Sequence, residues 1–215
     1  MKKLTLAAVS MACALSVLGQ GTVTFNNRVV GAGGVVTHVY GANPGNPSTS
    51  QVGNGSTDSP AGATDWSAYT ALSGANYFAQ LLAANGANQA EASLVPATPT
   101  TTFRTGAAAG FVNPVTATLV GVPGDSPAAT LEMVVWNNAS GLYPTWTQAS
   151  AAWASGLIQA GKSGAFNVNA IGGTLNSPPN LVGLQSFNIS GVPEPSSFAL
   201  AGLGAAALLI FRRRK

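Results

Sequence analysis

Hydrophobic and polar residues alternate along residues 130–136, the pattern of a β-strand whose two faces differ. Leu131 and Met133 point one way, whereas Glu132 and Trp136 point the other. No other segment of the chain shows the pattern as clearly. We therefore expect this segment to be a strand in the core of the domain.

Weaker alternation predicts further strands, and one segment has helical spacing. Trp146, Ala149 and Trp153 recur at the spacing of one helix face, which predicts a helix over residues 145–155. Residues 76–84 fit either a strand or a short helix. The other predicted strands cover residues 22–30, 35–40, 101–105, 115–120, 165–171 and 184–189.

Turn-forming residues separate these segments, and their distribution predicts the fold class. Residues 41–65 are rich in Gly, Pro, Asn, Ser and Thr, so we expect a long exposed loop there. About eight short strands with turns between them predict an all-β domain over residues 20–190. The expected architecture is an antiparallel β-sandwich, jelly-roll or Ig-like, with one short helix. With 26 Gly, 13 Pro and only 7% charged residues, the composition favours strands over surface helices.

The first nineteen residues have the three parts of a secretory signal peptide. Two lysines precede an apolar run over residues 4–18, and small residues lead to Gly19. We expect a signal helix over residues 1–19 that is cleaved between Gly19 and Gln20. The secretion translocon and signal peptidase are the partners that such a segment implies. An uncleaved N-terminal anchor is the alternative, but the apolar run is short for a membrane span.

The C-terminal end has the features of a membrane segment with a fixed direction. Residues 198–211 are wholly apolar and would extend ~21 Å as a helix, against roughly 30 Å of bilayer hydrocarbon. The sequence therefore predicts a short transmembrane helix. Four cations close the chain and are expected to stay in the cytoplasm. They are Arg212, Arg213, Arg214 and Lys215.

A proline-flanked glutamate precedes this apolar segment, in the motif Val192, Pro193, Glu194 and Pro195. With the short apolar helix and the arginine-rich end, residues 191–215 resemble the PEP-CTERM sorting domain of Gram-negative bacteria. The resemblance implies recognition and processing by exosortase, an integral membrane protease, often where exopolysaccharide and biofilm matrix are made. Segments 21–28, 103–106 and 161–164 also resemble uncharacterised PEP-CTERM proteins abundant in Verrucomicrobia-like bacteria. That second resemblance carries no activity.

The charge distribution argues against a nucleic-acid partner. The net charge of +3 and the isoelectric point of 9.3 come from the basic ends. Between Gln20 and Val192 three basic residues face five acidic ones, so this part has a net charge of −2 and no basic patch. The single cysteine, Cys13, lies in the leader and lacks the sequence context of a lipoprotein signal. The mature chain is therefore expected to have neither a disulfide nor a cysteine metal site.

Two sequence features invite an enzymatic interpretation, and neither supports one. Residues 156–163 match the phosphate-loop pattern, but a helix is predicted before them and a strand after them, the reverse of a nucleotide site. We expect a glycine turn there and no cofactor. His38, the only histidine, lies in a predicted strand, which favours a structural role. We therefore expect the protein to be no enzyme.

Several polar and aromatic residues are candidates for binding. Glu132 lies beside Trp136 on one strand face, which suggests a sugar site. Asn54 and Asp58 fall in the polar loop, but the acidic density is too low for a calcium site, and a solvated loop is expected. Other aromatic candidates for stacking on sugars are Trp66, Tyr69, Tyr143 and Trp146. Sequons begin at Asn54, Asn138 and Asn188, where exposure would fit a secreted chain.

These features together predict a non-catalytic protein of the cell envelope or extracellular matrix. We expect it to be exported, to cross the inner membrane once during sorting, and then to reach the cell surface or the matrix. Two alternatives remain open. The central domain would be an extracellular polysaccharide-binding module in the first and a secreted hydrolase in the second.

Overall fold

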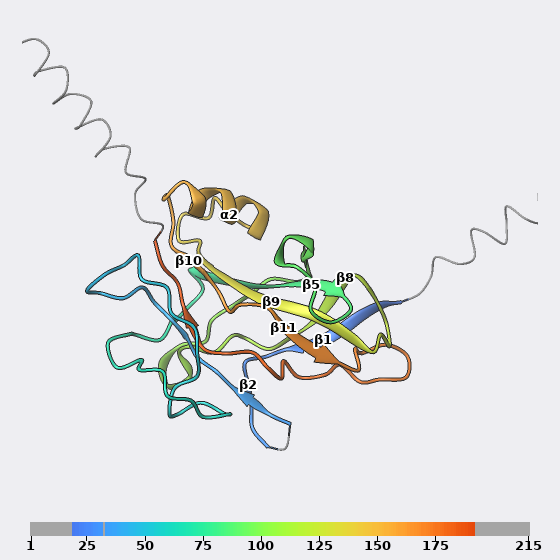
Figure 1. Cartoon of the computed structure of the whole chain (residues 1–215). Helices are drawn as coiled ribbons and strands as arrows, with labels where there is room; N and C mark the ends of the chain where they lie inside the picture. Colours follow the sequence, from blue (N-terminus) through green and yellow to red (C-terminus); the bar gives the residue numbers. More distant parts are fainter. Residues whose placement is uncertain (1–18, 32, 192–215) are drawn as a thin grey trace, which may run out of the picture.

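The computed structural model describes residues 19–31 and 33–191, which form one mostly β domain with a single α-helix (Figure 1). The helix is α2, Trp146–Ala154, and two short 3-10 helices are η2, Glu91–Ser93, and η3, Gly106–Ala108. The strands are β1 Gln20–Phe25, β2 Arg28–Val29, β3 Val35–Val36, β4 Val39–Tyr40, β5 Tyr77–Asn85, β6 Val95–Pro96, β7 Thr101–Thr102, β8 Val115–Pro123, β9 Ala128–Asn137, β10 Ala160–Lys162, β11 Phe166–Asn169 and β12 Phe187–Asn188.

The largest sheet is built around β9 and β5. Its strands run in the order β10, β9, β5 and β6, while β11 also pairs with β9 and β7 with β5. All these pairs are antiparallel, with Phe78 opposite Trp136 and Leu81 opposite Met133. The prediction for residues 130–136 is therefore confirmed, and residues 76–84 form a strand and not a helix.

The main core lies on one face of this sheet. Leu131 and Met133 of β9 are buried there with Val23 and Phe25 of β1 and with Leu119 of β8. The pair β1–β8 forms a separate two-stranded sheet, so side chains of two sheets share one core. The mostly β fold with one helix is confirmed, whereas the jelly-roll or Ig-like type stays a prediction.

The other face of β9 is also buried, because α2 covers it. Val134 and Trp136 pack there against Trp146 and Ala149 of the helix. The helix lies one residue inside the predicted range at each end, and Gly156, with φ of +73°, follows it in a conformation that favours glycine. The predicted helix and its inward face are confirmed.

Two predicted strands are each broken by a polar interruption. The segment 22–30 divides into β1 and β2 at Asn27, whose side chain is fully buried. The segment 35–40 divides into β3 and β4 at Thr37 and His38. Alternation alone did not indicate the breaks, because β-like side-chain alternation continues on both sides of each one.

The expectation of a wholly antiparallel sheet is wrong at one pair. Strand β12 pairs with β4 in parallel, with Phe187 opposite Val39. A parallel pair needs a long connection, which the chain between these strands provides. Short strands β6 and β10 were not predicted, because Val95–Pro96 and Ala160–Lys162 are too brief to show alternation.

The predicted membrane segments fall outside this domain. The leader up to residue 18 and the apolar run 198–211 lie outside the described residues, so their helices stay predictions, as does the division into domains at residues 19, 20–190 and 191–215. Among the described residues, no helix has the length and apolar character needed to cross a membrane.

Candidate functional site

An aromatic cluster forms where β4 meets the end of the long loop 41–65. Tyr40 ends β4, and its ring stacks on that of Trp66, with centroids 4.4 Å apart and planes 12° apart. Tyr69 meets Trp66 edge to face at 5.0 Å. The indole Nε1 of Trp66 donates a hydrogen bond of 2.9 Å to the carbonyl of Gly53, which ties the cluster to the loop.

An open pocket of about 500 Å³ lies over this cluster. Tyr40 and Trp66 supply its aromatic wall, and Asp65 is its only charged side chain. The backbone N–H of Ser67 donates to the Asp65 carboxylate and holds the pKa of that carboxyl below its usual value. The remaining lining residues are small or hydroxyl-bearing: Gly55, Ser56, Thr57, Gly62, Ala63, Thr64 and Ser67.

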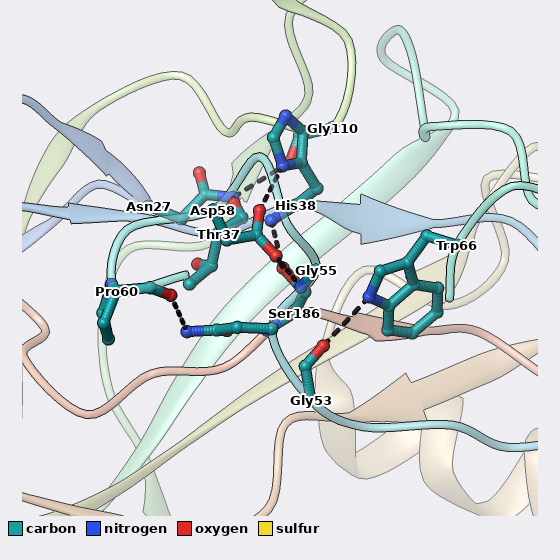
Figure 2. A network of polar contacts seen from close by, with 11 residues as sticks. Asn27, Thr37, His38, Gly53, Gly55, Asp58, Pro60, Trp66, Gly110 and Ser186 are labelled. Atoms are coloured by element: carbon teal, nitrogen blue, oxygen red, sulfur yellow. Dashed lines mark hydrogen bonds and ion pairs between the residues drawn. The ribbon is translucent and has the colours of Figure 1, made fainter. Parts of the chain in front are cut away.

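Beneath the pocket, the polar loop is fixed to the core by a buried carboxylate (Figure 2). One oxygen of Asp58 lies 2.7 Å from Nδ1 of His38. The other accepts hydrogen bonds from the Gly55 N–H at 2.6 Å and the Ser186 hydroxyl at 2.8 Å. Asp58 is buried, so the expectation of a solvated loop is wrong at this residue, because its carboxylate holds three segments together.

The same carboxylate influences the aromatic wall. Burial, with a contribution from the negative charge of Asp58, raises the pKa of Tyr40 to about 12. The Tyr40 hydroxyl is therefore neutral at physiological pH and available as a hydrogen-bond donor at the pocket.

His38, Asp58 and Ser186 are the three residue types of a hydrolytic relay, but their order is different. In such a relay the histidine lies between the serine and the aspartate. Here Asp58 lies between the other two, and the Ser186 hydroxyl also accepts a hydrogen bond of 2.7 Å from the His38 backbone N–H. Ser186 is fully buried. This arrangement positions the loop and leaves no exposed nucleophile in the network.

The calcium interpretation of the loop does not fit the geometry. Both oxygens of Asp58 already have protein donors, and the side chain of Asn54 bonds to Pro60 and to the backbone of Ser186. Within residues 19–31 and 33–191, no three His, Cys, Asp or Glu side chains lie close enough to hold a metal ion.

Residues 156–163 do not form a phosphate-binding loop. Gly161 and Lys162 lie in β10 and pair with Val135 and Val134 of β9. A side chain at Gly161 would collide with the carbonyl oxygen of Asn188, so close packing of the chain requires glycine there. The Lys162 ammonium forms an ion pair with Glu91 instead of facing an anion site.

The Glu132 candidate proves to be buried. Both Glu132 and Trp136 are almost inaccessible, so neither reaches a surface where a sugar could stack. The Oε2 atom of Glu132 has no hydrogen-bond partner among the described residues. Burial raises the pKa of Glu132 to about 7, although the charge of Lys162 lowers it and that of Glu91 raises it further.

The other candidates are distributed over two places. Trp66 and Tyr69 lie together at the pocket, whereas Tyr143 and Trp146 belong to the cluster beneath α2. The expected exposure of the sequons is wrong at Asn138 and Asn188, which are buried because their side chains bond to the backbone. Sequence reasoning missed Tyr40, Asp65 and Ser186, since no spacing linked them to the rest.

Comparison with known protein families matches residues 191–215 to the PEP-CTERM protein-sorting motif. The chain carries a PEP-CTERM sorting signal. No curated protein and no solved structure matches the chain.

The PEP-CTERM signal begins where the described domain ends. Exosortase, a membrane protein, recognises such signals, which direct an exported protein through a transient membrane-anchored stage to the cell surface. Gly191 is the only residue of the matched segment within the described residues, so the motif residues 192–195 and the basic end 212–215 lie outside them. At the other end, Gly19 and Gln20 are both exposed.

Proposed function

We propose that this protein is a non-catalytic component of the cell envelope or extracellular matrix, delivered by exosortase-dependent sorting. The observation that carries the proposal is the PEP-CTERM signal at residues 191–215, directly behind a domain whose hydrogen-bonded core is complete at Gly191. The buried His38–Asp58–Ser186 network supports a structural role for the residues that resemble a catalytic relay.

Intact-mass measurement of the protein from membrane, surface and medium fractions of its host tests this proposal. We expect a mature form that begins at Gln20 and ends near residues 192–195. Glu194→Ala should accumulate with its tail in the membrane fraction, whereas the matched variant Ser197→Ala should be processed normally. A surface form that keeps residues 198–215 in both variants and in the native chain would contradict processing.

The pocket over Tyr40 and Trp66 favours a second function, the binding of extracellular polysaccharide. A volume of about 500 Å³ suits one or two sugar units, and an aromatic wall beside hydroxyl-bearing side chains is a common sugar-binding arrangement. Because Asp65 is the only charged lining residue and is ionised at neutral pH, the pocket favours neutral or amino sugars over uronic acids.

Pull-down with insoluble polysaccharides tests this second function. We expect the full chain to bind cellulose or chitin more strongly than calcium alginate beads. Because Asp65 and Ser67 line the pocket and Thr70 does not, Asp65→Ala combined with Ser67→Ala should weaken binding at least tenfold, and Thr70→Ala should leave it unchanged. Equal retention of all variants, or preference for alginate, would argue against a sugar site here.

A further inference from the structure

The chain leaves the described domain at a fixed place beside α2. The Ser190 carbonyl accepts hydrogen bonds from the Trp153 indole Nε1 at 2.8 Å and from the Ala160 N–H at 3.1 Å. The Gly191 N–H then donates to the Pro47 carbonyl at 2.9 Å. Figure 1 shows the red C-terminal segment ending next to α2. The exit point is therefore held rigidly against the helix.

Exposed leucines lie around this exit. Leu142 is 67% exposed and Leu157 is 70% exposed, although both are large apolar side chains. An open pocket of about 420 Å³ joins Leu157 to Gly191, and Ser140, two residues before Leu142, also lines it. We name Leu142, Leu157 and the rim of this pocket the exit face.

The exit face lies in the longest stretch of the domain that carries no charge. Residues 133–161 contain no Asp, Glu, Lys, Arg or His, yet they hold three of the four tryptophans. Trp153 and Tyr143 are only half-buried at this end. Exposed leucines beside half-buried aromatic side chains, without charges, are typical of surfaces that contact the interfacial region of a bilayer.

The length of the connecting chain brings the exit face close to the membrane. Six residues, 192–197, separate Gly191 from the predicted span 198–211. Six fully extended residues reach only ~20 Å. As long as the tail spans the bilayer, the domain surface around Gly191 must therefore stay near the lipid headgroups.

We propose that the exit face contacts the bilayer surface while the tail is anchored, and that this contact holds the domain in one orientation. The proposal rests on the membrane-anchored stage of the proposed function. Leu142 and Leu157 enter the interfacial region, and the pocket at the loop end is held in a constant direction relative to the membrane. Removal of the tail ends the contact, because two leucines without a tether bind lipid weakly.

A matched control residue lies at the opposite end of the domain. Leu175 is 88% exposed, and its N–H donates to Asp125. The neighbouring Gly124 bonds to Gly19, where the described chain begins, and Figure 1 shows this end far from α2. Leu157 and Leu175 are thus equally apolar and exposed, but only Leu157 belongs to the exit face.

Spin labels at these two positions test the proposal. The full chain with its tail, as Leu157→Cys or Leu175→Cys, is reconstituted into vesicles of phosphatidylethanolamine and phosphatidylglycerol. Because Cys13 lies in the predicted leader, the leader-free chain offers no competing thiol. We expect the label at 157 to collide several-fold more often with oxygen than with an aqueous nickel complex, and the label at 175 to show the reverse.

Three results would overturn the proposal. Aqueous behaviour at 157 in a chain that floats with the vesicles would exclude the lipid contact while leaving the anchored stage intact. Dipolar broadening at 157 would assign the exit face to a second copy of the chain. Failure of the full chain to float with vesicles would remove the anchored stage itself, and the contact with it.

Discussion

Buried polar side chains join segments of this domain that lie far apart in the chain. The amide of Asn27 donates to the carbonyls of Thr37 and Gly110 at 2.7 and 2.9 Å, and its oxygen accepts from the Val112 N–H at 2.9 Å. Asp58 connects the long loop to residues near both ends in the same way. Such fully bonded polar groups fix one arrangement of loops that lack a hydrophobic interior of their own.

Glu132 is the exception, because its buried carboxyl has an oxygen without a partner among the described residues. Its pKa is about 7 in the folded domain against 4.5 for an ordinary glutamate. The folded state therefore holds this proton more tightly than the unfolded state. Its contribution to stability is complete below pH 4.5 and is lost as the pH rises through 7.

The variant Glu132→Gln should remove this pH dependence. Relative to the variant, the native chain should lose about 3 kcal/mol of unfolding free energy between pH 4.5 and pH 8, since each pKa unit corresponds to about 1.4 kcal/mol. Urea unfolding at both pH values measures the difference. Glu91→Gln, which alters an exposed carboxylate, should leave most of the dependence in place. A difference between Glu132→Gln and the native chain that is the same at both pH values would contradict the assignment.

Among the elements, α2 has the clearest single role, which is to cover the outer face of β9. Trp146 lies between Trp136 and Trp153, with ring centroids 5.8 and 6.1 Å away. The helix has no side-chain cap at Thr145, so packing of its inward face supplies most of its stability. The helical spacing of Trp146, Ala149 and Ala152 was enough to predict this element.

Truncation of Trp146 should show how much the helix contributes. Trp146→Ala should lower the unfolding free energy by about 3–5 kcal/mol, because it leaves a large cavity between α2 and β9. Denaturant titration followed by far-UV circular dichroism measures the change without relying on tryptophan fluorescence. Thr147→Ala, one residue further on an exposed position, should change stability by less than about 0.5 kcal/mol.

At the scale of the whole molecule, local pattern predicted the long elements and not the contacts between distant ones. β9, β5 and α2 were foreseen because their alternation or helical spacing extends over many residues. The parallel pair β4–β12 and the contact between Tyr40 and Trp66 were not, since they depend on how the chain returns across the domain. The sorting tail was predicted most fully, because its information lies in a contiguous motif.

The basic end should determine the direction in which the whole chain is held. Replacing the four terminal cations with glutamine should reduce the membrane-retained fraction severalfold and increase full-length protein on the outer side, because only a marginal apolar span remains. Fractionation with intact-mass measurement reveals the change. Arg28→Gln removes an exposed cation of the domain and should leave the distribution as it is. The same outcome for the substituted tail would show that the cations are dispensable. The replaced residues are Arg212, Arg213, Arg214 and Lys215.

The hydrogen bond from Gly191 to Pro47 is the last one that the described domain makes before the sorting motif begins. Every bond that holds the final segment in place therefore joins residues on the domain side of this point. In evolutionary terms, the two parts of the gene are free to change at separate rates. Substitutions that adapt the tail to a different exosortase leave the packing of the domain untouched, and a new domain can acquire the same destination by recombination at this junction.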